Sequence, residues 1–205
     1  MSLKIYGIAA SRAIRPLWAA EELGLPYEQI PIHYASPEVK QPGYLRLNPN
    51  GTVPVIEDNG LVVFESLAIT TYLARRYGAG TLGPDGWAEE AAVLQWTLWA
   101  ATEAEPLARQ WFHHTRFLPE DRREPGLARA ALQALAPRLA VLANAVSATG
   151  YLVAGRFTVA DLNMAAVLQR LAELGGHDHA GLMDWHRRCL ERPAARRAFA
   201  LRQPG

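Results

Sequence analysis

Two short apolar runs joined by Asn59-Gly60 are the feature that most restricts how this chain can fold. Residues 55–58 precede the dipeptide and residues 61–64 follow it. Asn-Gly between apolar runs is the strongest short signal for a β-hairpin, because both central positions of a type I′ turn need positive φ. The first half of the chain must therefore contain an antiparallel strand pair, and Val53-Pro54 stands directly before its first strand.

The residues around this hairpin predict a small α/β domain. Residues 3–8 have strand character, residues 12–23 have the apolar period of a helix, and residues 27–32 are expected to be a second strand. Together they predict a β-α-β unit, which is expected to be parallel and right-handed. A short apolar turn at residues 44–47, the hairpin and a helix over residues 66–77 complete the order β-α-β-α-β-β-α.

The second half of the chain shows only helical patterns. Residues 79–86 are rich in Gly and Pro and are the predicted linker, so the first domain is residues 1–78 and the second is residues 87–205. Pro106 predicts a kink or break in a long first helix, and Pro137 predicts a bend in the next one. An all-helical bundle is the expected architecture of this half.

The clearest helix start lies within this second half. Thr158-x-x-Asp161 fits a capping box, with Asp in place of the commoner Glu. Phe157 before the cap and Leu162 after it could form a hydrophobic staple. The residues that follow leave little polar surface, so this helix is expected to be buried.

Composition and charge exclude several classes of function. The net charge is +1 and the basic residues are scattered, which argues against nucleic-acid binding. The densest basic run, residues 187–197, has helical spacing and is expected to be a solvated face. Cys189 is the only cysteine, which excludes an internal disulfide, a Cys-x-x-Cys pair and a zinc site of several thiolates. We expect no metal site.

The sequence also carries a prediction about location. The N-terminus runs into strand-like sequence without a signal pattern, and we find no apolar run that approaches the length of a membrane span. A cytoplasmic protein without membrane contact is therefore expected.

Four segments, in this order and spacing, resemble the cytosolic glutathione transferases, and the resemblance covers essentially the full length. They are residues 21–28, residues 48–54, Glu65-Ser66, and Phe157-Thr158-x-Ala160-Asp161. The resemblance implies a thioredoxin-like domain followed by an all-helical domain. It implies an enzyme of detoxification, with glutathione as co-substrate, no tightly bound cofactor, a hydrophobic electrophile as second substrate, and a C2 homodimer.

Physical chemistry gives the glutathione-binding motifs separate tasks. A cis Val53-Pro54 bond would turn the N–H and C=O of Val53 outward, where the cysteinyl part of the peptide could pair with them; a trans proline that only starts a strand is the alternative. Ser66 at a helix N-terminus could receive a carboxylate, or could be a simple cap. Glu65 could hold the γ-glutamyl ammonium group. The residues predicted to bind glutathione are Lys40, Thr52, Val53, Pro54, Glu65 and Ser66, with Lys40 assigned by resemblance to the glycyl carboxylate.

The segment that should activate the thiol departs from the family pattern. A free thiol has a pKa of about 8.5, which nearby donors or positive charge must lower. Ile8 stands where many serine-type members carry the catalytic hydroxyl. Ser11 is the nearest substitute but could be a plain N-cap, and Arg12 could supply positive potential. Tyr6 would correspond to the tyrosine-type members, but we expect it to be packed.

The second substrate is expected to bind between the domains. The residues predicted to line that cleft are Ile8, Trp99, Thr102, Glu103, Pro106 and Arg109. For the nearby Trp96 we prefer a place in the core of the bundle. Two alternatives to the transferase use the same fold: a glutathione-binding adaptor or regulator without chemistry, and a glutathione-dependent isomerase or dehalogenase.

Overall fold

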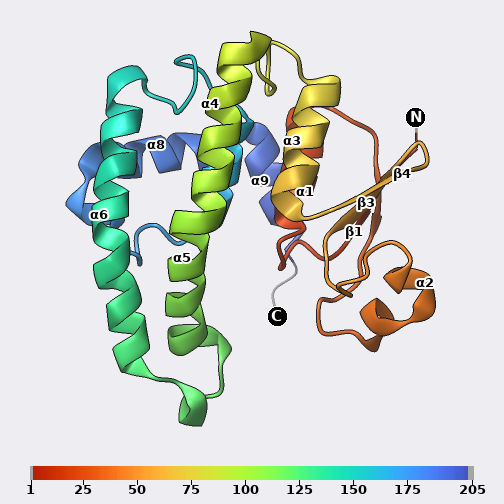
Figure 1. Cartoon of the computed structure of the whole chain (residues 1–205), viewed down its shortest axis with the longest axis horizontal. Coiled ribbons are helices and arrows are strands. Elements are labelled where there is room, and N and C mark those ends of the chain that lie inside the picture. The colour runs from red at the N-terminus through yellow and green to blue at the C-terminus, as the bar shows by residue number, and fades with distance from the viewer. Residues whose placement is uncertain (1, 203–205) are drawn as a thin grey trace. The chain divides into compact units, whose positions relative to one another are not determined.

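The computed structural model describes residues 2–202, and the first part of the chain is built on a four-stranded sheet (Figure 1). The strands are β1 (Leu3–Tyr6), β2 (Glu28–Ile30), β3 (Val55–Asp58) and β4 (Leu61–Phe64), in the order β2-β1-β3-β4. β1 pairs in parallel with β2 and antiparallel with β3, and β3 pairs antiparallel with β4.

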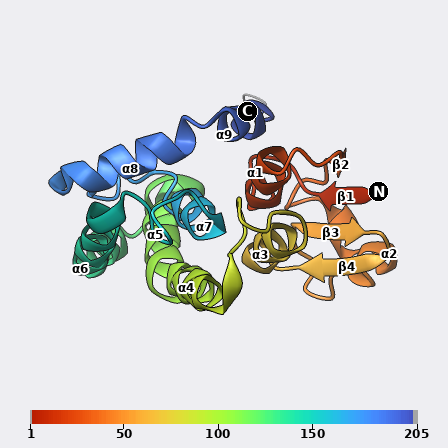
Figure 2. The same ribbon diagram turned by 90° about the horizontal axis from the view of Figure 1, so that it is seen from above.

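The hairpin and the mixed sheet confirm the fold expected for the first half. Asn59 and Gly60 connect β3 to β4 with φ values of 48° and 91°, as a type I′ turn requires. The helices are α1 (Ile14–Glu22), α2 (Pro42–Leu45) and α3 (Ser66–Tyr77), with a 3-10 turn, η1 (Pro37–Lys40), before α2. Figure 2 shows α1 and α3 on one side of the sheet and α2 on the other. The thioredoxin-like order β-α-β-α-β-β-α is therefore confirmed.

The chain divides into two units, and the division differs from the predicted one. Unit 1 takes the described residues of Met1–Asp85 and of Glu191–Gly205, and unit 2 is Gly86–Leu190. The predicted second domain, residues 87–205, is thus too long at its C-terminal end. The reason is that α9 (Pro193–Ala200) packs on α1. Its small side chains, Ala194, Ala195 and Ala198, are buried there.

Unit 2 is all-helical, as expected. Its elements are α4 (Gly86–Trp99), the π turn η2 (Ala100–Ala104), α5 (Glu105–Phe112), the π turn η3 (His113–Phe117), η4 (Glu120–Arg122), α6 (Pro125–Thr149), α7 (Val159–Val167), η5 (Gly176–Asp178) and α8 (Ala180–Leu190).

The proline in the long first helix widens a turn rather than breaking the helix. The N–H of Glu105 bonds to the carbonyl of Ala100, five residues earlier, so the segment before Pro106 is a π turn. A wider turn accommodates the proline ring and its missing N–H. The predicted irregularity near Pro106 therefore takes the form of a π turn.

Helix α6 is the longest helix of the described residues and is rich in Ala and Leu. It runs from Pro125 to Thr149 with Pro137 inside it, and by length and composition alone it could cross a membrane. A core helix of a soluble protein satisfies the same criterion. The buried side chains of α6 recur every three or four residues, which is the pattern of a helix with one face in a core; they are Ala128, Ala131, Leu135, Leu139, Leu142 and Val146.

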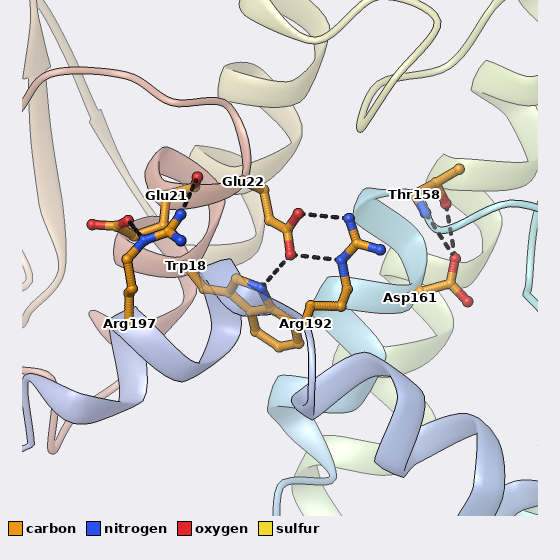
Figure 3. Close-up of polar contacts among 7 residues, drawn as sticks. All are labelled: Trp18, Glu21, Glu22, Thr158, Asp161, Arg192 and Arg197. Atoms are coloured by element: carbon orange, nitrogen blue, oxygen red, sulfur yellow. Dashed lines mark hydrogen bonds and ion pairs between the residues drawn. The ribbon is translucent and has the colours of Figure 1, made fainter.

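The predicted capping box starts α7, and every residue of that helix is buried. Asp161 accepts hydrogen bonds from the backbone N–H and the hydroxyl of Thr158, at 3.0 and 3.2 Å (Figure 3). It also accepts from the N–H of Leu152 and from Trp185 Nε1, each at 2.9 Å. Burial raises the pKa of Asp161 above its ordinary value, while the four donors oppose that rise. One carboxylate thus joins α7, α8 and the preceding loop.

Candidate glutathione-binding site

Residues 48–54 form a loop that buried side chains hold in place. The Val53-Pro54 peptide bond is cis. Asn48 is 1% exposed, and its Nδ2 donates to the carbonyl and the hydroxyl of Thr52 at 2.8 and 3.1 Å. The hydroxyl of Tyr44 donates to the same Thr52 carbonyl at 2.9 Å. The backbone that leads into Val53 is therefore fixed by two side chains, of which Tyr44 was not predicted from the sequence.

Lys40 closes this loop on its other side. Its ammonium group donates to the carbonyls of Asn50 and Gly51 at 3.2 and 2.9 Å. A Cβ at Gly51, where φ is +59°, would lie 2.7 Å from Lys40 Nζ, so glycine permits this approach. An ammonium group has three donors, and two are used here. The third is available to a carboxylate, and the predicted contact with the glycyl end stays a prediction.

Ser66 is the first residue of α3 and is 4% exposed. Its Oγ accepts a hydrogen bond from Nη1 of Arg15, in the first turn of α1, at 2.8 Å. Because a guanidinium only donates, Ser66 is the acceptor and its hydroxyl keeps a proton for another acceptor. Arg15 is 5% exposed, so a buried positive charge lies at the N-terminus of a twelve-residue helix. Both features favour an anion there. Apart from its position near the start of a helix, nothing in the local sequence indicates this role for Arg15.

Glu65 precedes α3 with an unusual backbone. It is the N-cap residue with φ of 70° and ψ of 111°, and its side chain is exposed. A non-glycine residue in such a region costs about 1–3 kcal/mol and is common where binding sites need a fixed geometry. The exposed carboxylate lies next to the anion site of Ser66. A group that carries both an ammonium and a carboxylate could therefore place its ammonium against Glu65 and its carboxylate against Ser66.

The loop of residues 7–13, here called the β1–α1 loop, packs against Val53. A Cβ on Gly7, where φ is +130°, would lie 2.7 Å from Cβ of Ala13 and 3.2 Å from Cβ of Val53. Gly7 is also held by its neighbours on β2, because Gln29 Nε2 donates to its carbonyl at 2.9 Å. The groups of this loop therefore stand at a fixed position beside the cis-proline segment.

Ser11 has a structural task in this loop. Its hydroxyl donates to the carbonyl of Ile8 at 2.7 Å and accepts from the N–H of Ala13 at 3.1 Å. The N-cap of α1 is Ala13, so the alternative of Ser11 as a plain N-cap is wrong. The hydroxyl proton that a catalytic serine would give to sulfur is used within the loop. Arg12, next to it, is exposed.

Tyr6 is packed, as expected. Its hydroxyl donates to the Glu57 carboxylate, and its ring meets Tyr44 edge-on at 6.2 Å between centroids. Burial and the adjacent carboxylate raise the pKa of Tyr6 above its usual range. Both observations argue against Tyr6 as the donor to a thiol.

The residues predicted for the second-substrate cleft belong to both units. Ile8 lies in unit 1, and the others follow one another along unit 2 from the end of α4 into α5: Trp99, Thr102, Glu103, Pro106 and Arg109. Within unit 2, Glu103 pairs with Arg138 at 3.0 Å, and Trp99 meets Trp96 edge-on at 5.6 Å. The cleft stays a prediction.

A thioredoxin-like unit whose chain continues into an all-helical unit defines the two-domain architecture of glutathione transferases. Family models agree: the glutathione S-transferase N-terminal domain matches residues 1–75, and the C-terminal domain matches residues 105–193. A glutathione S-transferase of Arabidopsis thaliana is 32% identical over 171 residues, which are 80% of this chain and 77% of that protein. The chain belongs to the glutathione S-transferase family.

A solved structure supports the assignment over the full fold. The theta class glutathione S-transferase of Xanthomonas axonopodis pv. citri, with glutathione bound, is 32% identical with a TM-score of 0.88, and the match covers 96% of each chain. A glutathione S-transferase of Hypomyces subiculosus is 40% identical over 118 residues, so the chain spans about half, 55%, of that relative's length.

Proposed function

We propose that this protein is a glutathione S-transferase that binds glutathione on unit 1 and transfers its sulfur to a hydrophobic electrophile. The observation that carries the proposal is the arrangement at the start of α3. The Ser66 hydroxyl accepts a hydrogen bond from buried Arg15 at 2.8 Å, and the next residue along the chain towards the N-terminus, Glu65, carries an exposed carboxylate. The γ-glutamyl end of glutathione carries a carboxylate and an ammonium group, which match these partners in charge.

The remaining contacts of the peptide follow the 48–54 loop. The backbone of Val53 pairs with the cysteinyl part as an added strand would, with Thr52 and Pro54 on either side. Lys40 receives the glycyl carboxylate with its third donor. These assignments are supported by the fixed backbone at Thr52, which accepts from Asn48 and Tyr44 at 2.8 and 2.9 Å.

Thiol activation falls to the β1–α1 loop. The positive charge of Arg12 and the backbone N–H groups near the start of α1 favour the thiolate, because positive charge and a helix N-terminus both lower a thiol pKa. Ser11 would take part only if its hydroxyl turned away from Ile8, to which it donates at 2.7 Å. We therefore propose Arg12 ahead of Ser11 as the activating residue.

The second substrate, the assembly and the location complete the proposal. We propose a hydrophobic electrophile as the second substrate, with Ile8, Trp99 and Arg109 among its candidate contacts. A C2 homodimer fits the exposed apolar side chains on the edge strand β4, where Leu61 is 48% and Phe64 is 37% exposed. Light scattering at micromolar concentration should give twice the 22.6 kDa chain mass, and a monomer would contradict the dimer. We propose that the protein is cytoplasmic and that its role is detoxification.

Calorimetric titration with glutathione, beside turnover of a chloronitroarene, tests the function. Binding with turnover is the expected result, and absence of binding would end the proposal. Binding without turnover would favour the adaptor or regulator, which is the second candidate because Ile8 replaces the usual hydroxyl and the Ser11 hydroxyl is bonded within its loop. An isomerase or dehalogenase would bind glutathione and turn over only its own electrophile.

A further inference from the structure

The segment that begins at Arg192 is joined to α1 by a partly buried ion pair. Nε and Nη2 of Arg192 donate to the two carboxylate oxygens of Glu22 at 2.7 and 2.8 Å (Figure 3). Trp18 Nε1 donates to the same carboxylate at 2.9 Å. The Glu22 side chain is 7% exposed, and paired geometry of this kind is both strong and specific in direction. The predicted solvated face of basic residues is thus partly wrong, because Arg192 bonds to α1.

Two further contacts set the direction of α9 along α1. Arg197 Nε donates to the Glu21 carboxylate at 2.6 Å, and that carboxylate also accepts from the Tyr27 hydroxyl at 3.0 Å. The ring of Phe199 meets buried Trp18 edge-on at 5.9 Å. Since α9 is held through Arg192 before it and through Arg197 and Phe199 within it, the helix has one position on α1, and Arg202 just after it has a defined place.

Arg202, just after α9, reaches the β1–α1 loop. Its Nε donates to the carbonyl of Ala9 at 3.1 Å, and its guanidinium lies 4.4 Å from the centroid of the Phe199 ring. The ring contact holds the plane of the guanidinium. Ala9 is 1% exposed, so this hydrogen bond is made to a buried residue of the loop.

The loop is thus held from two sides. At Gly7 the loop packs so closely on Val53 that a Cβ added to the glycine would lie 3.2 Å from the Val53 Cβ. At Ala9 the backbone carbonyl accepts a hydrogen bond from Arg202 Nε at 3.1 Å. Because a peptide unit is planar, fixing the Ala9 carbonyl also fixes the direction of the following N–H. A displacement of about 1 Å in a catalytic group can cost about a hundredfold in rate.

We propose that Arg202 is a positioning residue of the β1–α1 loop and sets the donors of this loop relative to the sulfur of bound glutathione. This inference rests on the proposed function of unit 1. Arg202 also adds a charge that persists at every working pH and favours the thiolate. The other ionisable side chains of the loop and of the elements beside it are Arg12 in the loop, Lys4 and Tyr6 on β1, Arg15, Glu21 and Glu22 on α1, Glu28 on β2, Glu57 and Asp58 on β3, and Arg196 and Arg197 on α9.

Three variants separate positioning from general stability. Arg202→Gln removes the charge, Arg202→Lys keeps a charged donor, and Arg196→Gln removes an exposed charge from α9, the helix that precedes Arg202, as a matched control. The full chain is used throughout, so α9 keeps its contacts through Arg192 and Arg197.

The first measurement is amide hydrogen exchange of residues 8–13 in the ligand-free protein. Arg202→Gln should speed exchange there about tenfold, as expected for loss of one charged hydrogen bond. Arg202→Lys and Arg196→Gln should exchange like the wild type. Equal exchange in Arg202→Gln and the wild type would overturn the inference.

The second measurement is the pH midpoint at which bound glutathione becomes a thiolate, followed by ultraviolet absorbance. Arg202→Gln should raise the midpoint by about half a unit or more while glutathione affinity changes by less than about threefold. An unmoved midpoint would overturn the inference. If the wild type binds no glutathione, the proposed function fails, and the exchange rates alone then decide whether Arg202 holds the loop.

Discussion

The substitution Ser66→Ala tests the anion site at the start of α3, and its effects can be worked out from two contacts. In the free protein, Arg15 donates to Ser66 Oγ at 2.8 Å, with both residues at most 5% exposed. Removing the acceptor takes away one buried hydrogen bond to a charged group, which is worth about 1.5–3 kcal/mol. The variant should therefore lose about 2 kcal/mol of its free energy of unfolding in urea.

The same substitution removes the hydroxyl that is proposed to donate to the γ-glutamyl carboxylate. A hydrogen bond to a charged group of about 1.5–3 kcal/mol corresponds to a loss of about 10- to 100-fold in glutathione affinity. A glutathione analogue without that carboxylate should bind wild type and Ser66→Ala with nearly equal affinity, because neither protein can then use the contact.

Calorimetry with both ligands measures these affinities. Ser147→Ala is the matched control, since Ser147 is an exposed hydroxyl on α6 that donates to the carbonyl of Asn144 at 2.9 Å, and it should change stability by at most about 0.5 kcal/mol. Unchanged glutathione affinity in Ser66→Ala would refute the reasoning. So would an equal loss for glutathione and for the analogue, because the hydroxyl would then act on the protein rather than on the carboxylate.

Three other predictions concern single residues. Asp161→Asn, with its amide group toward Thr158, loses the bond from the Thr158 backbone N–H at 3.0 Å and leaves that buried donor unpaired; urea unfolding should show a loss of about 3 kcal/mol, and a loss below about 1 kcal/mol would contradict the role of the carboxylate. At position 65, where φ is 70°, glycine should give a free energy of unfolding about 1 kcal/mol higher than alanine, because only glycine adopts this backbone without strain. Inside α3, Ala68→Gly should lower the free energy of unfolding by about 1 kcal/mol. If glycine is less stable than alanine at both positions, Glu65 is not strained. Burial lowers the pKa of His186 below its unfolded value of about 6.5, so the stabilising contribution of the neutral ring is present above that pH and is lost as the pH falls below it. The free energy of unfolding should therefore fall more from pH 7 to pH 5 in the wild type than in His186→Asn. Parallel curves would argue against a buried neutral histidine.

Local patterns in the sequence predicted much of the fold. The hairpin at Asn59-Gly60 and the capping box of Thr158 and Asp161 were correct because each depends on a few adjacent residues whose chemistry specifies one conformation. The helical second half followed from periodicity in the same way.

Long-range contacts were not predictable from these patterns. Arg192 and Glu22 are 170 residues apart, and nothing in a basic run tells which arginine meets a carboxylate. For this reason α9 was assigned to the wrong domain. The buried position of Arg15 beneath Ser66 likewise depends on two helices meeting, which the sequence of neither helix specifies.

The β1–α1 loop shows a different limit. Residue types predicted that Ser11 could donate to a thiol, but a hydroxyl can donate in only one direction at a time. The structure directs it to the carbonyl of Ile8 at 2.7 Å. The assignment of the activating group therefore depends on geometry within six residues, and Arg12→Gln beside Ser11→Ala is the pair of variants that separates the two.

The central claim is that unit 1 binds glutathione and favours its thiolate. One pH titration of the thiolate absorbance of glutathione bound to the wild-type protein tests it most directly. The account predicts a midpoint at least about one unit below the value of about 8.5 for a free thiol. A midpoint equal to that of free glutathione, at saturating binding, would contradict it.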